Sequence, residues 1–295
     1  MSAGEAAPRD SSLLDFVRSV AVLAVLADHV LETTGALRGF DPTPLAWYLG
    51  RMGVLLFFVL TSLVLLRSLE RSARRGDPGA AAFFVRRAFR IYPLAVLTVL
   101  AVVALGVPAT AWESAPEAPG AGRLLSNLAL TMNLTATKPV LSVLWTLPYE
   151  LQMYLFLPLV FRVVHGPDGV RNAVALLGLG VVAALVQPGL VGRLGVAQFA
   201  PCFLAGGVSY ALGRRARRTL PFPAAALALA ALLAAYCAAA SALGEVHPRW
   251  LGWGLCLAVG VLLPFAAEPA SRTLRATSRE IARYSYGLYL FHMPA

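Results

Sequence analysis

Long apolar runs separated by short polar segments make up most of the chain, and this alternation predicts its elements. A helix needs about 20 apolar residues to cross the hydrocarbon core of a bilayer. Runs of this kind predict nine membrane-spanning helices, at residues 13–31, 47–66, 88–106, 141–163, 170–187, 194–213, 222–243, 249–267 and 281 to the end. No internal repeat or second domain stands out. We therefore predict an all-α, polytopic transmembrane helix bundle that forms one domain over residues 1–295.

The stretch 123–135, "RLLSNLALTMNLT", is apolar in helical rhythm but short and partly polar. If it does not cross the membrane, eighteen basic residues fall in inside loops and six in outside loops; if it crosses, the numbers become eleven and thirteen. Cytoplasmic loops carry an excess of Lys and Arg, so the first topology is favoured. We therefore predict an extracytoplasmic loop at 107–140 with a re-entrant or interfacial helix. The N-terminus is then cytoplasmic, in a multi-pass protein of the cytoplasmic membrane.

Composition supports a membrane protein and argues against a nucleic-acid-binding protein and against a metal site formed by cysteines. Apolar residues make up 58% and charged residues 14% of the chain, compared with roughly 25% charged in soluble domains. The net charge of +10 comes mainly from arginines between apolar runs, which is typical of cytoplasmic loops and not of a nucleic-acid-binding face. The three cysteines lie in apolar stretches without CxxC or Cys/His spacing, so no metal site is expected.

Ionisable residues interrupt the first apolar run, with Arg18 near one end and the pair Asp28 and His29 near the other. Arg18 and His29 are eleven positions apart, which on an α-helix is about 20° past three full turns, with a rise of roughly 16 Å. They therefore share one helix face at two depths. Each has a structural alternative, a snorkelling anchor for Arg18 and a hydrogen-bonded interior histidine for His29. Because ionisable groups within a membrane usually face a cavity or a partner, the pair favours a functional role.

The third predicted span begins with "FFVRRAFRIYP", which places Arg86, Arg87 and Arg90 at its cytoplasmic edge. Arg87 and Arg90 are three residues apart and therefore adjacent on a helix surface. Paired guanidinium groups suit a phosphorylated cytoplasmic ligand, because arginine binds phosphate bidentately. The alternative is that these arginines only anchor the topology.

A carboxylate also lies in an apolar run, in "LWTLPYELQMYLFLPL". This residue, Glu150, is a functional candidate because carboxylates are costly in a membrane. It is also a candidate to orient His29 or to balance its charge. The chain ends on "YSYGLYLFHMPA", a polar-aromatic stripe that includes His292. For its tyrosines an interfacial aromatic belt is the simpler interpretation.

Five blocks, in order along the chain, resemble the acyltransferase 3 family of membrane-bound O-acyltransferases. "LDFVR" with His29 is similar to the family's first-helix pattern of Arg, ten residues and His, and "FFVLTS" resembles "FFVLSG". "RRAFRIYP" resembles an Arg-x-x-Arg helix start, "LWTLPYELQMY" a Trp-Ser-Leu-Ser-Val-Glu helix, and "YSYGLYLFHMP" a late "SYxLYLxHxP" helix. Phe16 and Ser62 replace family glycines. The family usually continues through one further helix, so the resemblance implies a C-terminally truncated acyltransferase domain.

The resemblance implies transfer of an acyl group, usually acetyl, from cytoplasmic acyl-CoA to a hydroxyl of a carbohydrate or related acceptor, often at the outer face. Acyl-CoA is then a co-substrate, and no permanently bound cofactor is expected. His29 would act as general base or transient acyl carrier, and Glu150 would tune it. The arginines would bind the donor: Arg86, Arg87 and Arg90 at the CoA phosphates, and Arg18 partway along.

Two other functions account for part of the pattern. An Arg/Glu/His set inside a helix bundle also suits proton relay in a proton-coupled transporter or permease. Transporters, however, tend to show inverted repeats with paired broken helices, and none is visible in this sequence. A non-catalytic membrane scaffold would leave the charges inside the apolar runs unexplained. Acyl transfer is therefore the preferred interpretation.

Overall fold

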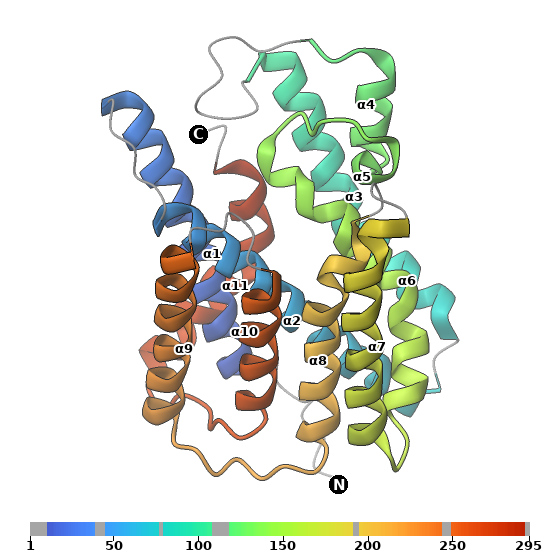
Figure 1. The fold of residues 1–295 in the computed structure, drawn as a ribbon, viewed down its shortest axis with the longest axis vertical. Helices are drawn as coiled ribbons and strands as arrows, with labels where there is room; N and C mark the ends of the chain where they lie inside the picture. The colour runs from blue at the N-terminus through green and yellow to red at the C-terminus, as the bar shows by residue number, and fades with distance from the viewer. Residues whose placement is uncertain are drawn as a thin grey trace, which may run out of the picture.

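The computed structural model describes residues 11–38, 45–76, 79–107, 118–190, 195–243 and 249–292. These residues form a bundle of helices (Figure 1). No strand occurs among them, and one isolated backbone bridge joins Leu220 to Ala266. The predicted all-α class is confirmed for the described part of the chain.

The longer helices are α1 (Ser12–Arg38), α2 (Leu45–Arg74), α3 (Gly79–Leu105), α6 (Leu147–Val164), α7 (Gly169–Leu190), α8 (Ala200–Gly213), α9 (Phe222–Leu243), α10 (Arg249–Leu262) and α11 (Arg272–Phe291). Short 3₁₀ turns, η1 (Ser142–Thr146) and η2 (Val196–Phe199), precede α6 and α8. In the described residues, six helices are long and apolar enough to cross a membrane: α2, α3, α6 with η1, α7, α8 with η2, and α9. The chain is therefore a multi-pass membrane protein, although the predicted count of nine spans is not confirmed.

The three other predicted spans are helical but differ in length or polarity. The 14 residues of α10 rise about 21 Å, less than the roughly 30 Å hydrocarbon core. α1 is long but carries charged residues along its length, and α11 begins at Arg272, nine residues before the predicted start. The first half of α11 contains three arginines and a glutamate. The prediction followed hydropathy and therefore covered only the apolar second half of α11, whereas the helix begins in the polar sequence before it.

α2 forms the centre of the bundle. In its most apolar stretch 72% of the residues are buried, compared with 22% in the corresponding stretches of α7 and α9. α2 contacts α1, α6, α8, α9 and α10. Small residues allow the closest of these contacts: a Cβ at Gly206 of α8 would lie 2.4 Å from the backbone oxygen of Val59 in α2. A larger residue at 206 would therefore force α8 away from α2.

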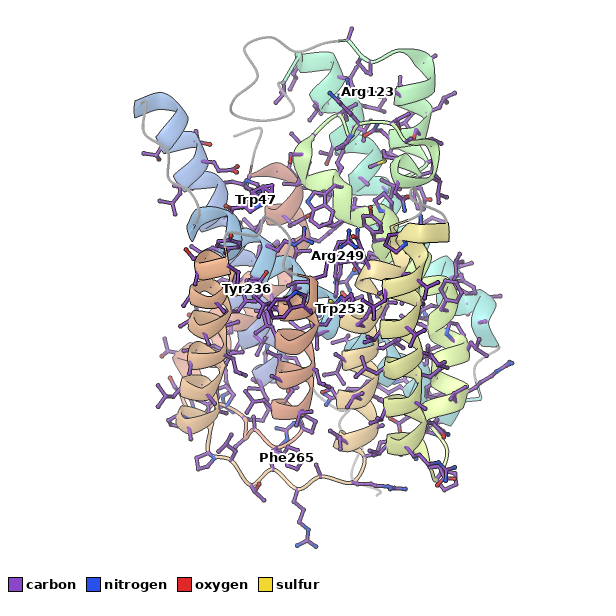
Figure 2. The ribbon with its side chains drawn as sticks, in the orientation of Figure 1. Trp47, Arg123, Tyr236, Arg249, Trp253 and Phe265 are labelled. Atoms are coloured by element: carbon purple, nitrogen blue, oxygen red, sulfur yellow. The ribbon has the colours of Figure 1, made fainter. Side chains whose placement is uncertain are left out.

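The segment predicted as a re-entrant or interfacial element contains two short helices, α4 (Ala121–Leu128) and α5 (Met132–Thr135). Eight residues of α4 rise only about 12 Å, so this helix is too short to cross a bilayer. The backbone adopts φ of 54° at both Leu130 and Ala136, which ends each helix. The fully buried Asn127 ties the segment together, donating to the backbone oxygens of Arg123 (labelled in Figure 2) and Lys138 and accepting from the Val140 amide. Figure 1 shows α4 and α5 at the end of the bundle where α11 ends.

The start of α1 is held by a carboxylate from the segment between α10 and α11. Glu268 accepts hydrogen bonds from the Ser11 hydroxyl and from the Leu13 amide, each at 2.7 Å, and pairs with Arg218. Burial alone would raise the pKa of Glu268, but the bonds from Ser11, Arg218 and Leu13 lower it below its ordinary value of 4.5. The carboxylate therefore stabilises the folded state when it is ionised.

Glu268→Gln is expected to lower the free energy of unfolding by about 1 kcal/mol, a value reduced for partial exposure. Since the folded pKa is depressed, the contribution is present above pH 4.5 and is lost as the pH falls through the folded pKa. Thermal unfolding of both proteins in detergent, measured across pH, checks this. A difference between them that does not shrink in acid would contradict it.

Candidate functional site

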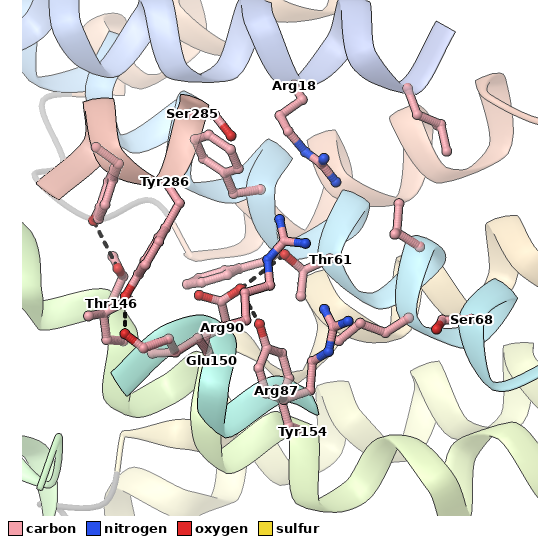
Figure 3. Close-up of a pocket in the computed structure, with 18 of the residues that line it drawn as sticks. Arg18, Thr61, Ser68, Arg87, Arg90, Thr146, Glu150, Tyr154, Ser285 and Tyr286 are labelled. Atoms are coloured by element: carbon pink, nitrogen blue, oxygen red, sulfur yellow. Dashed lines mark hydrogen bonds between the residues drawn. The ribbon is translucent and has the colours of Figure 1, made fainter. Parts of the chain in front are cut away.

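A cavity of about 250 Å³ lies among α1, α2, α3, α6 and α11 (Figure 3). Each of the five sequence blocks singled out above contributes to its lining. The contributions, in chain order, are Leu14, Asp15 and Arg18; Phe57, Phe58 and Thr61; Arg87, Arg90 and Ile91; Thr146, Leu147, Glu150 and Tyr154; and Ser285, Tyr286 and Tyr289. Residues from near the start of the chain, such as Leu14, and from near its end, such as Tyr289, therefore line the same cavity.

Arginines from three helices give the cavity its positive charge. Arg18 comes from α1, Arg87 and Arg90 come from α3, and Arg71 comes from α2. Sequence reasoning identified the first three and missed Arg71, which lies in a run of arginines that reads as a cytoplasmic loop. Two carboxylates also line the cavity, so its cations outnumber its anions. Figure 3 shows Arg18, Arg87 and Arg90 extending into the same space, an arrangement suited to an anionic ligand.

Arg87 carries a donor that the protein leaves unused. Its Nε is buried and has no hydrogen-bond partner. Buried polar groups in proteins are nearly always hydrogen-bonded, and each exception calls for an explanation. A ligand oxygen in the cavity would satisfy this donor.

The structure does not bring Arg86 to the cavity with its neighbours. Its guanidinium donates to the Ser72 hydroxyl at 3.1 Å in an exposed position, and the residue is absent from the cavity lining. Successive helix positions point about 100° apart, so Arg86 faces away when Arg87 faces inward.

Glu150 lies in the first turn of α6 and forms part of the cavity wall. Its Oε1 accepts from the Tyr154 hydroxyl at 2.7 Å and from the Thr61 hydroxyl at 3.1 Å. The helix N-terminus also favours negative charge at this position. Among the contacts of the described residues, none joins Glu150 to His29, so the predicted role of Glu150 as the partner of His29 is not supported by contact.

Two tyrosines of α11 face inward and anchor this helix. The Tyr289 hydroxyl donates to the Val143 backbone oxygen at 2.8 Å, and the Tyr286 hydroxyl donates to the Ile91 oxygen at 2.9 Å. The tyrosines predicted to form an interfacial belt therefore lie in two different places: Tyr284 is 57% exposed, whereas Tyr286 and Tyr289 line the cavity. The reason is that a hydroxyl with a buried partner holds its ring inside the bundle.

His29 lies outside the lining of the arginine cavity and has its own polar neighbours. Its Nδ1 is 3.1 Å from Glu32 Oε2 and 3.9 Å from Asp28 Oδ2. Sequence reasoning missed Glu32, although residues three apart are neighbours on a helix surface and Glu32 is three residues after His29. A carboxylate at Nδ1 favours the tautomer in which Nε2 is unprotonated. His29 is thus arranged to accept a proton at Nε2.

A second concavity links the arginine cavity to the histidines. This groove, about 800 Å³, runs along α3 and α11 and ends at His292. Arg90 and Tyr286 line both the groove and the arginine cavity. The ring of His292 in turn stacks on that of His29, with ring centroids 4.8 Å apart. Arg90 and Tyr286 therefore lie where the arginine cavity meets the groove that ends at His292.

Comparison with known proteins gives one result. A family model described as an acyltransferase domain, of the acyltransferase 3 type, matches residues 12–295. This range includes every helix of the described structure. Neither a curated protein nor a solved structure matches the chain.

Proposed function

Because the chain belongs to the acyltransferase 3 family over residues 12–295 and contains membrane-spanning helices, we propose that this membrane acyltransferase moves an acetyl group from cytoplasmic acyl-CoA to a hydroxyl of a carbohydrate or glycoconjugate. The observation that carries the proposal is the convergence of the five sequence blocks on one arginine-lined cavity. A positively charged space inside an apolar bundle is costly unless it serves a ligand.

The donor is assigned to this cavity. Arginine binds phosphate oxygens bidentately, and Arg87 and Arg90 are the adjacent pair of guanidinium groups suited to the CoA phosphates. The cavity volume of about 250 Å³ is slightly below the roughly 300–1,000 Å³ of typical ligand pockets. The cavity would therefore enclose part of the donor, with the rest extending toward the cytoplasm past Arg71. Arg18, on the opposite wall, would contact the enclosed part.

The chemical step is assigned to His29. Its Nε2 takes the proton of the acceptor hydroxyl while the hydroxyl oxygen attacks the thioester carbonyl. The C–S bond then breaks, the acyl group remains on the acceptor as an ester, and the CoA sulfur leaves and takes up a proton. Glu32 holds Nδ1 during this step, since it lies 3.1 Å from that atom. A transient acyl group on His29 itself is the second route.

The acceptor would approach from the end of the bundle that carries α4 and α5. The basic-residue distribution assigns this end to the outside and the start of α1 to the cytoplasm. The thioester would reach His29 from the arginine cavity by passing Arg90 and Tyr286 into the groove along α11. This arrangement keeps the CoA phosphates on the cytoplasmic side while the acyl group reaches an outer acceptor.

The function is tested with purified protein in liposomes. Acetyl-CoA is expected to release free CoA when cell-envelope glycan is added, and the glycan is expected to gain the mass of one acetyl group per transfer. A proton-coupled transporter would instead move solute across the liposome membrane without forming free CoA. Mass comparison of envelope glycans from cells with and without the gene would then identify the acceptor.

A further inference from the structure

Three potential metal ligands lie together on the C-terminal half of α1. One ligand atom from each of Asp28, His29 and Glu32 falls within 4.8 Å of the others. Asp28 and Glu32 are four residues apart and His29 and Glu32 are three apart, so all three side chains occupy neighbouring positions on the helix. Imidazole and carboxylate groups at such spacings on helices bind transition metals in several protein classes.

Asp28 supplies an independent reason to expect a cation at this place. Its side chain is 9% exposed, and its Oδ1 is buried with no hydrogen-bond partner. A buried carboxylate oxygen without a partner is energetically costly. The neighbouring helix leaves room for this group, because a Cβ at Gly50 of α2 would lie 1.9 Å from Asp28 Oδ2. The chain therefore accommodates a buried carboxylate beside His29 without giving one of its oxygens a protein partner.

His292 packs against the cluster without belonging to its ligand group. Its Nδ1 lies 3.0 Å from the Leu288 backbone oxygen, which can only accept a hydrogen bond, so Nδ1 is the protonated nitrogen of the neutral ring. Nε2 is then unprotonated, and it is buried without a partner. The ring stacks on that of His29 with centroids 4.8 Å apart. The ligand group itself is one imidazole and two carboxylates, and zinc is bound by three protein ligands of these kinds with a water in the fourth position.

The distances require the cluster to close. Zinc binds imidazole nitrogen and carboxylate oxygen at about 2.0–2.2 Å in tetrahedral geometry, so two ligands of one ion lie about 3.5 Å apart. The widest spacing in the cluster is 4.8 Å. Rotation of the Glu32 side chain, which is 32% exposed, can supply this closure.

We propose that Asp28, His29 and Glu32 form a Zn²⁺ site, and that Zn²⁺ bound there inhibits acyl transfer. Zinc would occupy a lone pair of His29 or displace Glu32 from its Nδ1, and either event removes the base from the reaction. The inhibitory part rests on the proposed function, whereas the binding part does not. The site would make the enzyme sensitive to free zinc on the side of the membrane where the acceptor approaches.

Binding is tested by isothermal titration of the metal-free full-length protein in detergent with Zn²⁺. We expect one site per chain and at least a tenfold loss of affinity in Glu32→Gln and in Asp28→Asn. The matched control is Glu280→Gln on α11, an exposed glutamate outside the cluster, which should bind zinc like the original chain. A second readout uses Co²⁺ in place of Zn²⁺. Co²⁺ bound by few ligands absorbs visible light strongly, so binding at this site is expected to give an intense visible band.

The same samples separate failure of the site from failure of the proposed function. Absence of a stoichiometric zinc site, or unchanged affinity in both cluster variants, would overturn the proposal whatever the activity. Zinc bound at this site without loss of acyl transfer would overturn its inhibitory part. If the protein binds zinc as expected but transfers no acyl group even without zinc, the metal site stands and the proposed function fails.

Discussion

His29→Ala is expected to abolish acyl transfer, with a loss of at least about 10²-fold to 10⁴-fold, the range typical of removing a general base. Expression and acyl-CoA binding should remain nearly unchanged, because His29 lies outside the lining of the arginine cavity. The measurement is acyl transfer in membranes that contain matched amounts of each variant, together with acyl-CoA binding by the same variants in detergent.

Two neighbouring variants make this result specific. Asp28→Asn should matter less than His29→Ala, since the adjacent helix position points about 100° away. Glu32→Gln should fall between them, because the amide can still bond Nδ1 but carries no charge to stabilise the imidazolium. If Asp28→Asn is inactive and His29→Ala is active, Asp28 is the reacting group instead. If His29→Ala fails only because the protein does not accumulate, His29 has a structural role.

Replacing both Arg87 and Arg90 with Ala is expected to weaken acyl-CoA binding by at least about 100-fold. Each hydrogen bond to a charged group is worth about 1.5–3 kcal/mol, and every 1.4 kcal/mol is a factor of ten in Kd. Equilibrium binding of acetyl-CoA to the purified variant measures this loss.

Arg86→Ala is the matched control, because Arg86 lies beside Arg87 in the chain but bonds Ser72 outside the cavity. It removes one positive charge from the same helix end and should leave acyl-CoA binding unchanged. If the double variant binds acyl-CoA normally and instead inserts in the wrong orientation, these arginines act as topology anchors.

Hydropathy predicted the helices better than their ends. The runs at 47–66, 88–106, 141–163, 170–187, 194–213 and 222–243 correspond to helices able to span a membrane. For α11 the prediction began at residue 281, whereas the helix begins at Arg272. A transmembrane pattern reports where apolar side chains occur, while a helix continues wherever its backbone hydrogen bonds can form.

The cavity was predictable in part. Arg18 and Glu150 stood out because charge inside an apolar run is unusual, and Arg87 and Arg90 because a spacing of three makes them neighbours on a helix surface. All four line the cavity. Arg71 did not stand out, because arginines near the end of a span are expected in any cytoplasmic loop. Side-chain direction and tertiary packing decide which of these arginines turn inward, and neither is visible in the local sequence.

The partner of His29 shows the same limit. Glu150, on α6, was a candidate because it is a lone carboxylate in an apolar run, but it bonds Thr61 and Tyr154. Glu32 supplies the contact from the same helix as His29. Its spacing of three residues was visible in the sequence, but a glutamate near the end of an apolar run is ordinary. Geometry was needed to recognise the pair.

The central claim is that the arginine cavity holds the acyl-CoA donor, and photo-crosslinking tests it most directly. A photoreactive acyl-CoA analogue is bound to the purified full-length protein and irradiated, and the modified peptides are mapped by mass spectrometry. The account predicts crosslinks to cavity-lining segments of α2, α3 and α6 around Thr61, Arg90 and Tyr154, suppressed by excess acetyl-CoA and absent from the Arg87→Ala/Arg90→Ala variant. Crosslinks confined to other segments, or unaffected by excess acetyl-CoA, would contradict it.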